Sequence, residues 1–136
     1  TEFLAEDMGI YTTPYEHFGK FTYEMWRACR LVVDTGIHAF GWSRDKAVKF
    51  MADNTALSIH EINTEIDRYI SWPGQALAYK IGEITIRELR KKAEKALKGN
   101  FDIRDFHEII LEKGTVTLPI LKKRVNQYIE DKKIEL

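Results

Sequence analysis

Three polar residues at four-residue steps could form a small catalytic group. Arg30, Asp34 and His38 follow one another at this spacing in a segment with helical periodicity, so they would share one helix face. An aspartate beside a histidine can fix the imidazole tautomer, and an imidazole held in this way can donate a hydrogen bond to an oxyanion. The same spacing also suits a structural network of ion pairs near a helix end, which is the more frequent arrangement.

A second group of polar and aromatic residues lies in the segment Tyr69–Gly82, which reads YISWPGQALAYKIG and directly follows Arg68. Because proline suits the first turn of a helix, we expect a helix to begin at Pro73. Gln75 and Tyr79 would then lie on one face near the positively polarised N-terminus of that helix. Gln75 could bind a peptide backbone and Tyr79 an oxyanion, although a helix-to-helix turn packed by aromatic rings has the same pattern.

The histidines and the single cysteine do not complete a self-contained catalytic site. A helical metallopeptidase site needs two histidines four residues apart, with a glutamate after the first. The pairs His60-Glu61 and His107-Glu108 both lack the second histidine, and the four histidines lie on separate segments. Cys29 falls in an apolar helix and is interpreted as a small buried residue. We therefore expect no metal site formed by this chain alone.

Helix start and stop signals predict an all-α fold of about six helices. Thr13 to Glu16 reads as a capping box with proline at the first helical position, and Gly41 is a stop signal, so a helix is expected from Pro14 to about Phe40. Gly36 inside this helix costs about 1 kcal/mol relative to alanine, which predicts a close packing contact. The apolar face of this helix is predicted to contain Phe18, Phe21, Met25, Cys29 and Val32. Further helices are expected at residues 44–53, 59–70 and 73–97, after Asp102, and from Thr117 and Pro119.

The helix expected at residues 73–97 changes character along its length. Its first half is apolar, whereas the stretch from Arg87 to Lys98 is dominated by charged residues. We expect the first half to pack in the core and the charged half to extend into solvent. The tail from Glu130 to Leu136 is polar and is predicted to fray.

Composition narrows the classes of function. A chain of 136 residues with a formal net charge of zero is expected to form one domain, 1–136, and lacks the basic excess of nucleic-acid or anionic-membrane binding proteins. No apolar run reaches the length of a membrane span. Thr1 to Met8 reads like the end of a helix that began earlier, so we expect a piece of a longer protein. The cellular location is therefore left open.

Four stretches of the chain resemble one bacterial family in sequence and order. They are Leu31–His38 (LVVDTGIH), Gly41–Arg44 (GWSR), Asn54–Ser58 (NTALS) and Glu65–Lys80 (EIDRYISWPGQALAYK). Through them the chain resembles the C-terminal part of the family known as domain of unknown function 885, which looks like a gluzincin-type zinc metallopeptidase. The resemblance extends to about Tyr128. It implies a C-terminal helical subdomain of a zinc-dependent peptidase.

The resemblance also implies that the metal is bound outside this chain. In the family, an upstream helix supplies two histidine ligands and the catalytic glutamate, and a later segment supplies a third ligand. The last two positions of that segment match Thr1 and Glu2. This chain would then hold no cofactor, zinc would belong to the longer parent, and the isolated chain would be inactive. Its partners would be the upstream zinc-binding portion of the same protein and a peptide substrate.

Residue roles follow from the same resemblance. By analogy with gluzincins, His38 and Tyr79 would stabilise the tetrahedral oxyanion, and Asp34 would orient His38. Either of two arginines could bind a substrate carboxylate or pair with a neighbouring acid. The supporting or substrate-binding positions are Asp34, Arg30, Arg68, Tyr69 and Gln75.

A different function class also fits the sequence. The chain could be a non-catalytic helical interaction module that docks through Trp42, Trp72 and the charged stretch from Arg87 to Lys98. This hypothesis predicts salt-sensitive binding of a partner, which charge reversal along that stretch would abolish. Self-association would not separate the two hypotheses, because a piece cut from a larger protein can also dimerise through an exposed apolar face.

The metal content of the purified chain tests the first hypothesis. After exhaustive dialysis we expect no tightly bound zinc, because the sequence contains no complete ligand set. Elemental analysis of the dialysed protein provides the measurement. One zinc per chain, or per pair of chains, would mean that the histidines form a site and would refute the proposed upstream metal centre.

Overall fold

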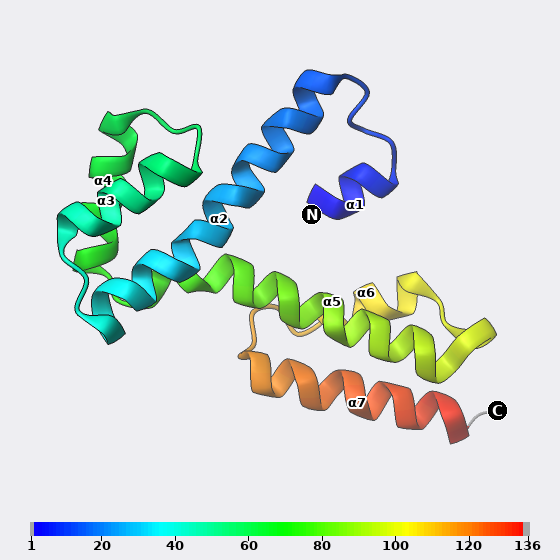
Figure 1. Cartoon of the computed structure of the whole chain (residues 1–136). Helices are drawn as coiled ribbons and strands as arrows, with labels where there is room; N and C mark the ends of the chain where they lie inside the picture. Colours follow the sequence, from blue (N-terminus) through cyan, green and yellow to red (C-terminus); the bar gives the residue numbers. More distant parts are fainter. Residues whose placement is uncertain (1, 135–136) are drawn as a thin grey trace. The chain divides into compact units, whose positions relative to one another are not determined.

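The computed structural model describes residues 2–134, with side chains from residue 4 onward. Over this range the fold is all-α, as predicted, with seven α-helices joined by short loops and two 3₁₀ turns (Figure 1). No helix in the described range is both long and apolar enough to cross a membrane. The elements are α1 (Glu2–Asp7), α2 (Pro14–Phe40), α3 (Arg44–Asn54), α4 (Ile59–Ser71), η1 (Gln75–Leu77), α5 (Ala78–Leu97), η2 (Lys98–Asn100), α6 (Ile103–Leu111) and α7 (Leu118–Ile134).

Two expectations fall partly outside the described residues. Thr1, which carries half of the terminal family match, is not described, and neither are Glu135 and Leu136 at the end of the predicted frayed tail. The described part of that tail is helical, because α7 continues to Ile134.

Local capping explains why several predicted helix boundaries are confirmed. The Thr13 hydroxyl accepts a hydrogen bond from the backbone N–H of Glu16 at 3.3 Å, and the Glu16 carboxylate accepts one from the backbone N–H of Thr13 at 2.9 Å. Ser58 and Glu61 form the same reciprocal pair at the start of α4. Gly41 ends α2 with φ of 63°, a conformation that glycine adopts without steric cost. These signals involve residues close in sequence, so they are readable before the fold is known.

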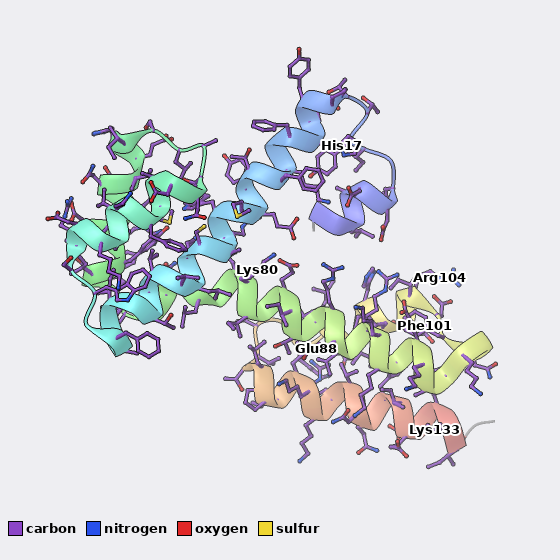
Figure 2. The ribbon with its side chains drawn as sticks, viewed as in Figure 1. His17, Lys80, Glu88, Phe101, Arg104 and Lys133 are labelled. Atoms are coloured by element: carbon purple, nitrogen blue, oxygen red, sulfur yellow. The ribbon has the colours of Figure 1, made fainter. Side chains whose placement is uncertain are left out.

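The buried residues form two clusters, one in each of two compact units. Residues 1–80 make up unit 1 and residues 81–136 make up unit 2. In unit 1 the cluster comes from α2, α3, α4 and η1, and includes Val33, Met51 and Ile66. In unit 2 it comes from α5, α6 and α7. Phe106 is the largest fully buried side chain of unit 2 and lies against Phe101, with ring centroids 6.0 Å apart (Figure 2 labels Phe101).

Burial along α2 differs from the predicted apolar face. Cys29 is buried as expected, but Phe18, Phe21, Met25 and Val32 are exposed. The buried positions after Cys29 are Arg30, Val33, Asp34 and Gly36, so the covered face begins in the C-terminal half of the helix, where α3 and α4 pack. Periodicity identified the helix, but it could not say which part of the stripe another helix covers.

The two halves of α5 are also buried in the reverse of the predicted order. In the first half Ile81 and Ile84 are exposed, whereas the charged half contributes Leu89, Ala93 and Leu97 to the core of unit 2. These three residues are four apart and form one narrow stripe, which packs while the charged side chains between them face outward. The charged composition of this stretch concealed the stripe.

The helix expected to begin at Pro73 begins instead at Ala78. Pro73 and Gly74 lie in a turn, and the single 3₁₀ turn η1 precedes α5. Gly74 has φ of 81°, and its backbone N–H donates to the carboxylate of Asp34 at 3.0 Å and 3.2 Å. The start of α5 therefore depends on a contact with α2, forty residues earlier in the chain, and not only on the local preference of proline.

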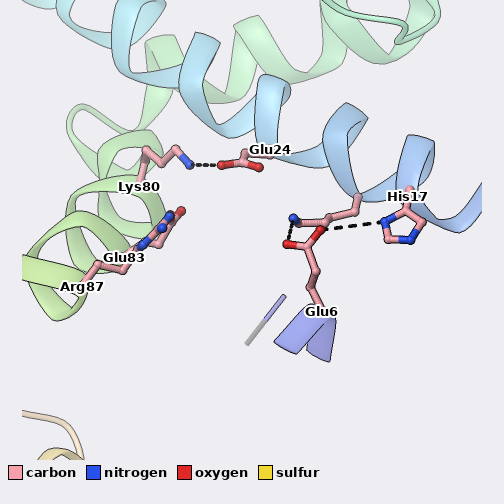
Figure 3. Close-up of polar contacts among 7 residues, drawn as sticks. Glu6, His17, Glu24, Lys80, Glu83 and Arg87 are labelled. Carbon is pink, nitrogen blue, oxygen red and sulfur yellow. Dashed lines mark hydrogen bonds and ion pairs between the residues drawn. The ribbon is translucent and has the colours of Figure 1, made fainter. Parts of the chain in front are cut away.

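Ion pairs within unit 1 connect α1 and the start of α5 to α2 (Figure 3). Glu6 of α1 accepts a hydrogen bond from the ammonium group of Lys20, which is buried, and lies 3.8 Å from Nδ1 of His17. Lys80 Nζ lies 3.2 Å from Oε1 of Glu24. These ion pairs attach α1 and the first turn of α5 to the N-terminal half of α2.

The predicted packing contact at Gly36 is present, and it can be tested. A Cβ atom at Gly36 would lie 2.6 Å from Cδ2 of the Trp42 indole, so Gly36→Ala should lower the free energy of unfolding by about 1–3 kcal/mol. Denaturant unfolding followed by circular dichroism measures the change. Gly19→Ala in the same helix is the matched control, because nothing lies within 4 Å of the added methyl group. It should raise stability by about 0.5–1 kcal/mol. Equal effects in the two variants would contradict this account.

Candidate functional site

The guanidinium of Arg30 lies at the centre of a polar and aromatic cluster in unit 1. Arg30 is only 4% exposed, and its Cζ lies 5.7 Å from the ring centroid of Trp26, 5.4 Å from that of Tyr69 and 5.2 Å from that of Tyr79. Cation–π attraction of this kind contributes about 0.5–2 kcal/mol per ring, with the larger values in desolvated positions. We call this group, with the residues that bond to it, the Arg30 cluster: Trp26, Arg30, Glu65, Arg68, Tyr69, Gln75 and Tyr79.

Gln75 joins the two arginines of the cluster. Its side-chain oxygen Oε1 accepts a hydrogen bond from Arg30 Nη2 at 3.1 Å and another from Arg68 Nη1 at 2.7 Å. The Nε atom of Arg30 is buried and has no hydrogen-bond acceptor within the described part of the chain. Two cationic groups thus share one neutral oxygen, and the Nε–H group of Arg30 is left without an acceptor in the described part of the chain.

Glu65 is the acidic residue of the cluster, and its carboxylate bonds to Arg68 and Tyr69 and not to Arg30. Its carboxylate accepts hydrogen bonds from Arg68 Nη2 at 2.6 Å and from the Tyr69 hydroxyl at 2.7 Å. Burial raises the pKa of Glu65, but the bonds from Arg68 and Tyr69 outweigh it, so that the pKa lies below its ordinary value. Burial raises the pKa of Tyr69, and the hydrogen bond to Glu65 raises it further. Trp26 Nε1 donates to the Tyr69 hydroxyl at 3.1 Å, which continues the network to α2.

Asp34 and His38 have partners other than each other. The carboxylate of Asp34, which is buried, accepts from the backbone N–H of Gly74. Nε2 of His38 lies 2.9 Å from the carbonyl oxygen of Tyr69 and donates to it, so that His38 connects the end of α2 to the last turn of α4. The expected pairing, in which Asp34 orients His38, is replaced by two contacts that hold the turn between α4 and α5. The catalytic role of His38 stays a prediction.

Tyr79 is the most exposed member of the aromatic group. It is 58% exposed, at the second residue of α5, and its ring also lies 5.7 Å from Cζ of Arg27. The structure therefore brings Tyr79 of α5 and Gln75 of η1 close to Arg30.

Two members of the Arg30 cluster were not singled out in the sequence. Trp26 precedes Arg30 by four residues, and Glu65 precedes Tyr69 by four. Each therefore shares a helix face with a selected residue, and that spacing could have identified both. A cavity of about 310 Å³ borders the cluster at these two residues, and its other lining residues are Tyr23, Leu57, His60, Glu61 and Thr64.

The described range also contains the histidines and tryptophans considered for metal binding and docking. Within it, no three side chains of His, Cys, Asp or Glu gather in a way that could hold a metal ion. Trp42 lies over Gly36 and against Phe50 in unit 1, where it supports the core, whereas Trp72 is exposed. Of the charged stretch in α5, Lys92 donates to Asn126 of α7 and Arg90 pairs with Glu94.

Comparisons with known proteins identify relatives that match most of this chain. The family model described as "Bacterial protein of unknown function (DUF885)" matches residues 1–125. A solved structure described as "The crystal structure of the putative lipoprotein from Colwellia psychrerythraea" is similar with a TM-score of 0.91 and 38% sequence identity. The match covers 94% of this chain and 22% of that one, so this chain spans about a fifth of its length. No curated protein matches the sequence.

The ion pair of Glu65 predicts a specific dependence of stability on pH. Because the folded pKa of Glu65 lies below its ordinary value of 4.5, its contribution is present above that pH and is lost as the pH falls through the folded pKa. Glu65→Gln should lower the free energy of unfolding at pH 7 by about 1–3 kcal/mol and make it less sensitive to acid.

Urea unfolding at several pH values measures both effects. Asp53→Asn is the control, since Asp53 forms an exposed pair with Lys49, and its effect at pH 7 should stay within about 0.5 kcal/mol. If the Glu65→Gln variant retained the full acid sensitivity of the unsubstituted chain, Glu65 would not be the titrating group.

Proposed function

The chain belongs to the bacterial DUF885 family, and from this membership we propose that it is the C-terminal helical part of a zinc-dependent peptidase. In this proposal the chain forms one wall of the substrate cleft. The zinc ion and its ligands belong to a part of the protein that precedes this chain. Zinc held there would supply an activated water for hydrolysis of the peptide bond, and residues of this chain would bind the substrate and stabilise the negative charge that develops.

The observation that carries the proposal is the convergence on Arg30. Residues selected from four separate segments meet there: Arg30 from α2, Arg68 and Tyr69 from α4, Gln75 from η1, and Tyr79 from α5. A structural ion network would be expected to pair both Arg30 and Arg68 with an acid, yet within the described residues Arg68 has such a partner and Arg30 does not. A cluster with surplus donors and an exposed tyrosine is typical of a surface that binds an anionic or polar group.

Tyr79 is the preferred oxyanion donor of this chain. Its side chain is more than half exposed, and it lies within range of two guanidinium groups, those of Arg27 and Arg30. Neighbouring positive charges stabilise a developing negative charge on a bound substrate. His38 is the less favoured candidate. Its Nε2 is engaged with the Tyr69 carbonyl, so that only the other ring nitrogen is left to act on a substrate.

The length of the solved relative supports a site shared with other parts of a longer protein. That chain is several times longer than the segment matched here. The proposal therefore assigns the chemistry to the longer protein and the substrate contacts to this chain. The alternative, an interaction module docking through Trp42, Trp72 and the stretch from Arg87 to Lys98, is weakened at Trp42, whose indole lies against Gly36, whereas Trp72 is exposed.

The proposal predicts that Tyr79 matters for turnover and not for folding. In the zinc-loaded longer protein, Tyr79→Phe should lower kcat for peptide hydrolysis by about 10²-fold, because it removes a donor to the oxyanion. The free energy of unfolding should change by less than about 0.5 kcal/mol, since the ring is retained at an exposed position.

Peptide hydrolysis by the longer protein, assayed with and without a chelator, is the measurement. Tyr15→Phe is the control, because Tyr15 is 88% exposed on α2, and it should leave kcat unchanged. Unchanged turnover in both Tyr79→Phe and His38→Ala would refute the assignment of the oxyanion donor. Hydrolysis that is absent even with zinc would refute the peptidase itself.

A further inference from the structure

Arg30 keeps its positive charge in the interior of unit 1 without an acidic partner. It is 4% exposed, and within the described residues no carboxylate lies at ion-pair distance from it. The guanidinium group remains charged in proteins, and a buried charge is costly unless it is paired. The three aromatic rings recover part of this cost. They do so through their faces, however, and accept no hydrogen bond in the plane of the guanidinium.

The nearest acids are used elsewhere. Glu65 is within electrostatic reach of Arg30, but its oxygens are held by Arg68 and the Tyr69 hydroxyl. Asp34 lies one turn after Arg30 on α2, and its oxygens accept from the backbone N–H of Gly74. Neither acid occupies the in-plane donors of Arg30, and Nε has no acceptor at all in the described part of the chain.

The contact that a ligand could most readily replace is the one between the Gln75 side-chain oxygen and the two arginines. Gln75 Oε1 accepts from Arg30 and Arg68 together, at 3.1 Å and 2.7 Å. A carboxylate would add an opposite charge to these bonds, and the guanidinium fork matches its two oxygens. A carboxylate in this position would satisfy more donors than a single amide oxygen does.

The residues that cover Arg30 can move aside. Gln75 is exposed, and so is Tyr79, whose ring lies 5.2 Å from the guanidinium. Both belong to the short segment that follows Gly74, and exposed side chains change rotamer rapidly. Rotation of the Gln75 side chain would free the donors of Arg30 and Arg68 without unfolding any helix.

We propose that Arg30 and Arg68 form a carboxylate-binding site, in which a carboxylate of the ligand replaces the side-chain oxygen of Gln75. The ring of Tyr79 lies beside the bound group. Only the identification of this carboxylate as the C-terminal group of a short peptide rests on the proposed peptidase function. The site itself rests on the buried donors.

Binding of three small probes to this chain tests the class of ligand. N-acetyl-Ala-Ala carries a C-terminal carboxylate, N-acetyl-Glu-amide carries one on its side chain, and N-acetyl-Ala-Ala-amide carries none. We expect millimolar binding of one or both acids, seen as a shift of the Arg30 Nε–H resonance assigned with Arg30→Lys, and binding of the amide about tenfold weaker or weaker. Preference for the C-terminal acid identifies a peptide end, whereas preference for N-acetyl-Glu-amide identifies an acidic side chain. Equal shifts with the amide, or no shift with any probe, would overturn the site.

An isosteric variant at Gln75 provides an internal test. Gln75→Glu should place a carboxylate between Arg30 and Arg68, raise the melting temperature, and weaken binding of N-acetyl-Ala-Ala by about tenfold or more. Ala52→Glu is the control, because it adds the same charge at an exposed position of α3, and it should leave binding unchanged. A Gln75→Glu chain that binds the probe as well as the parent chain would overturn the proposal.

These measurements separate this inference from the proposed function. They use equilibrium binding to the chain without metal, whereas the peptidase proposal is judged by hydrolysis in the zinc-loaded longer protein. Acid-selective binding without hydrolysis would leave the carboxylate site standing and remove the peptidase. Hydrolysis without acid-selective binding would support the peptidase and overturn the carboxylate site.

Discussion

The structure of unit 1 depends on keeping the guanidinium of Arg30 inside the molecule. Its charge is stabilised by the faces of Trp26, Tyr69 and Tyr79 and by the side-chain oxygen of Gln75. These groups come from three helices and the turn between them, so the helices must meet where the charge lies. A hydrophobic residue at this position would pack at lower cost. The retention of a buried cation is therefore the strongest physical indication of a ligand site in this chain.

Two further contacts hold the segment that covers the arginine. The Asp34 carboxylate holds the backbone of Gly74, and the His38 imidazole holds the carbonyl of Tyr69. They extend from the C-terminal half of α2 to the turn before α5 and to the last turn of α4. Asp34 and His38 therefore hold the segment that carries Gln75 and Tyr79. They fix where Gln75 and Tyr79 lie relative to Arg30, and so they govern the geometry of any group bound there.

The N-terminal half of α2 exposes several apolar side chains. Phe18, Phe21 and Met25 are half exposed or more, whereas the C-terminal half of the helix is covered by α3 and α4. Ordered contacts of the N-terminal half include the ion pairs of Glu6 with Lys20 and of Glu24 with Lys80. Apolar side chains exposed along one helix in this way are typical of a surface that another protein segment contacts.

Local signals determined most of the secondary structure, because capping and glycine stops act between residues a few positions apart. Thr13 with Glu16, Ser58 with Glu61, and Gly41 were readable from the sequence for this reason, and the site residues could be selected from their spacing and a family resemblance. The sequence could not reveal that Asp34 would bind Gly74, that α5 would begin at Ala78, or that its charged half would enter a core. Those outcomes depend on contacts between distant segments. Only the tertiary structure decided that Arg68 obtains an acid partner and Arg30 does not, because the carboxylates of Glu65 and Asp34 were already engaged by nearer donors.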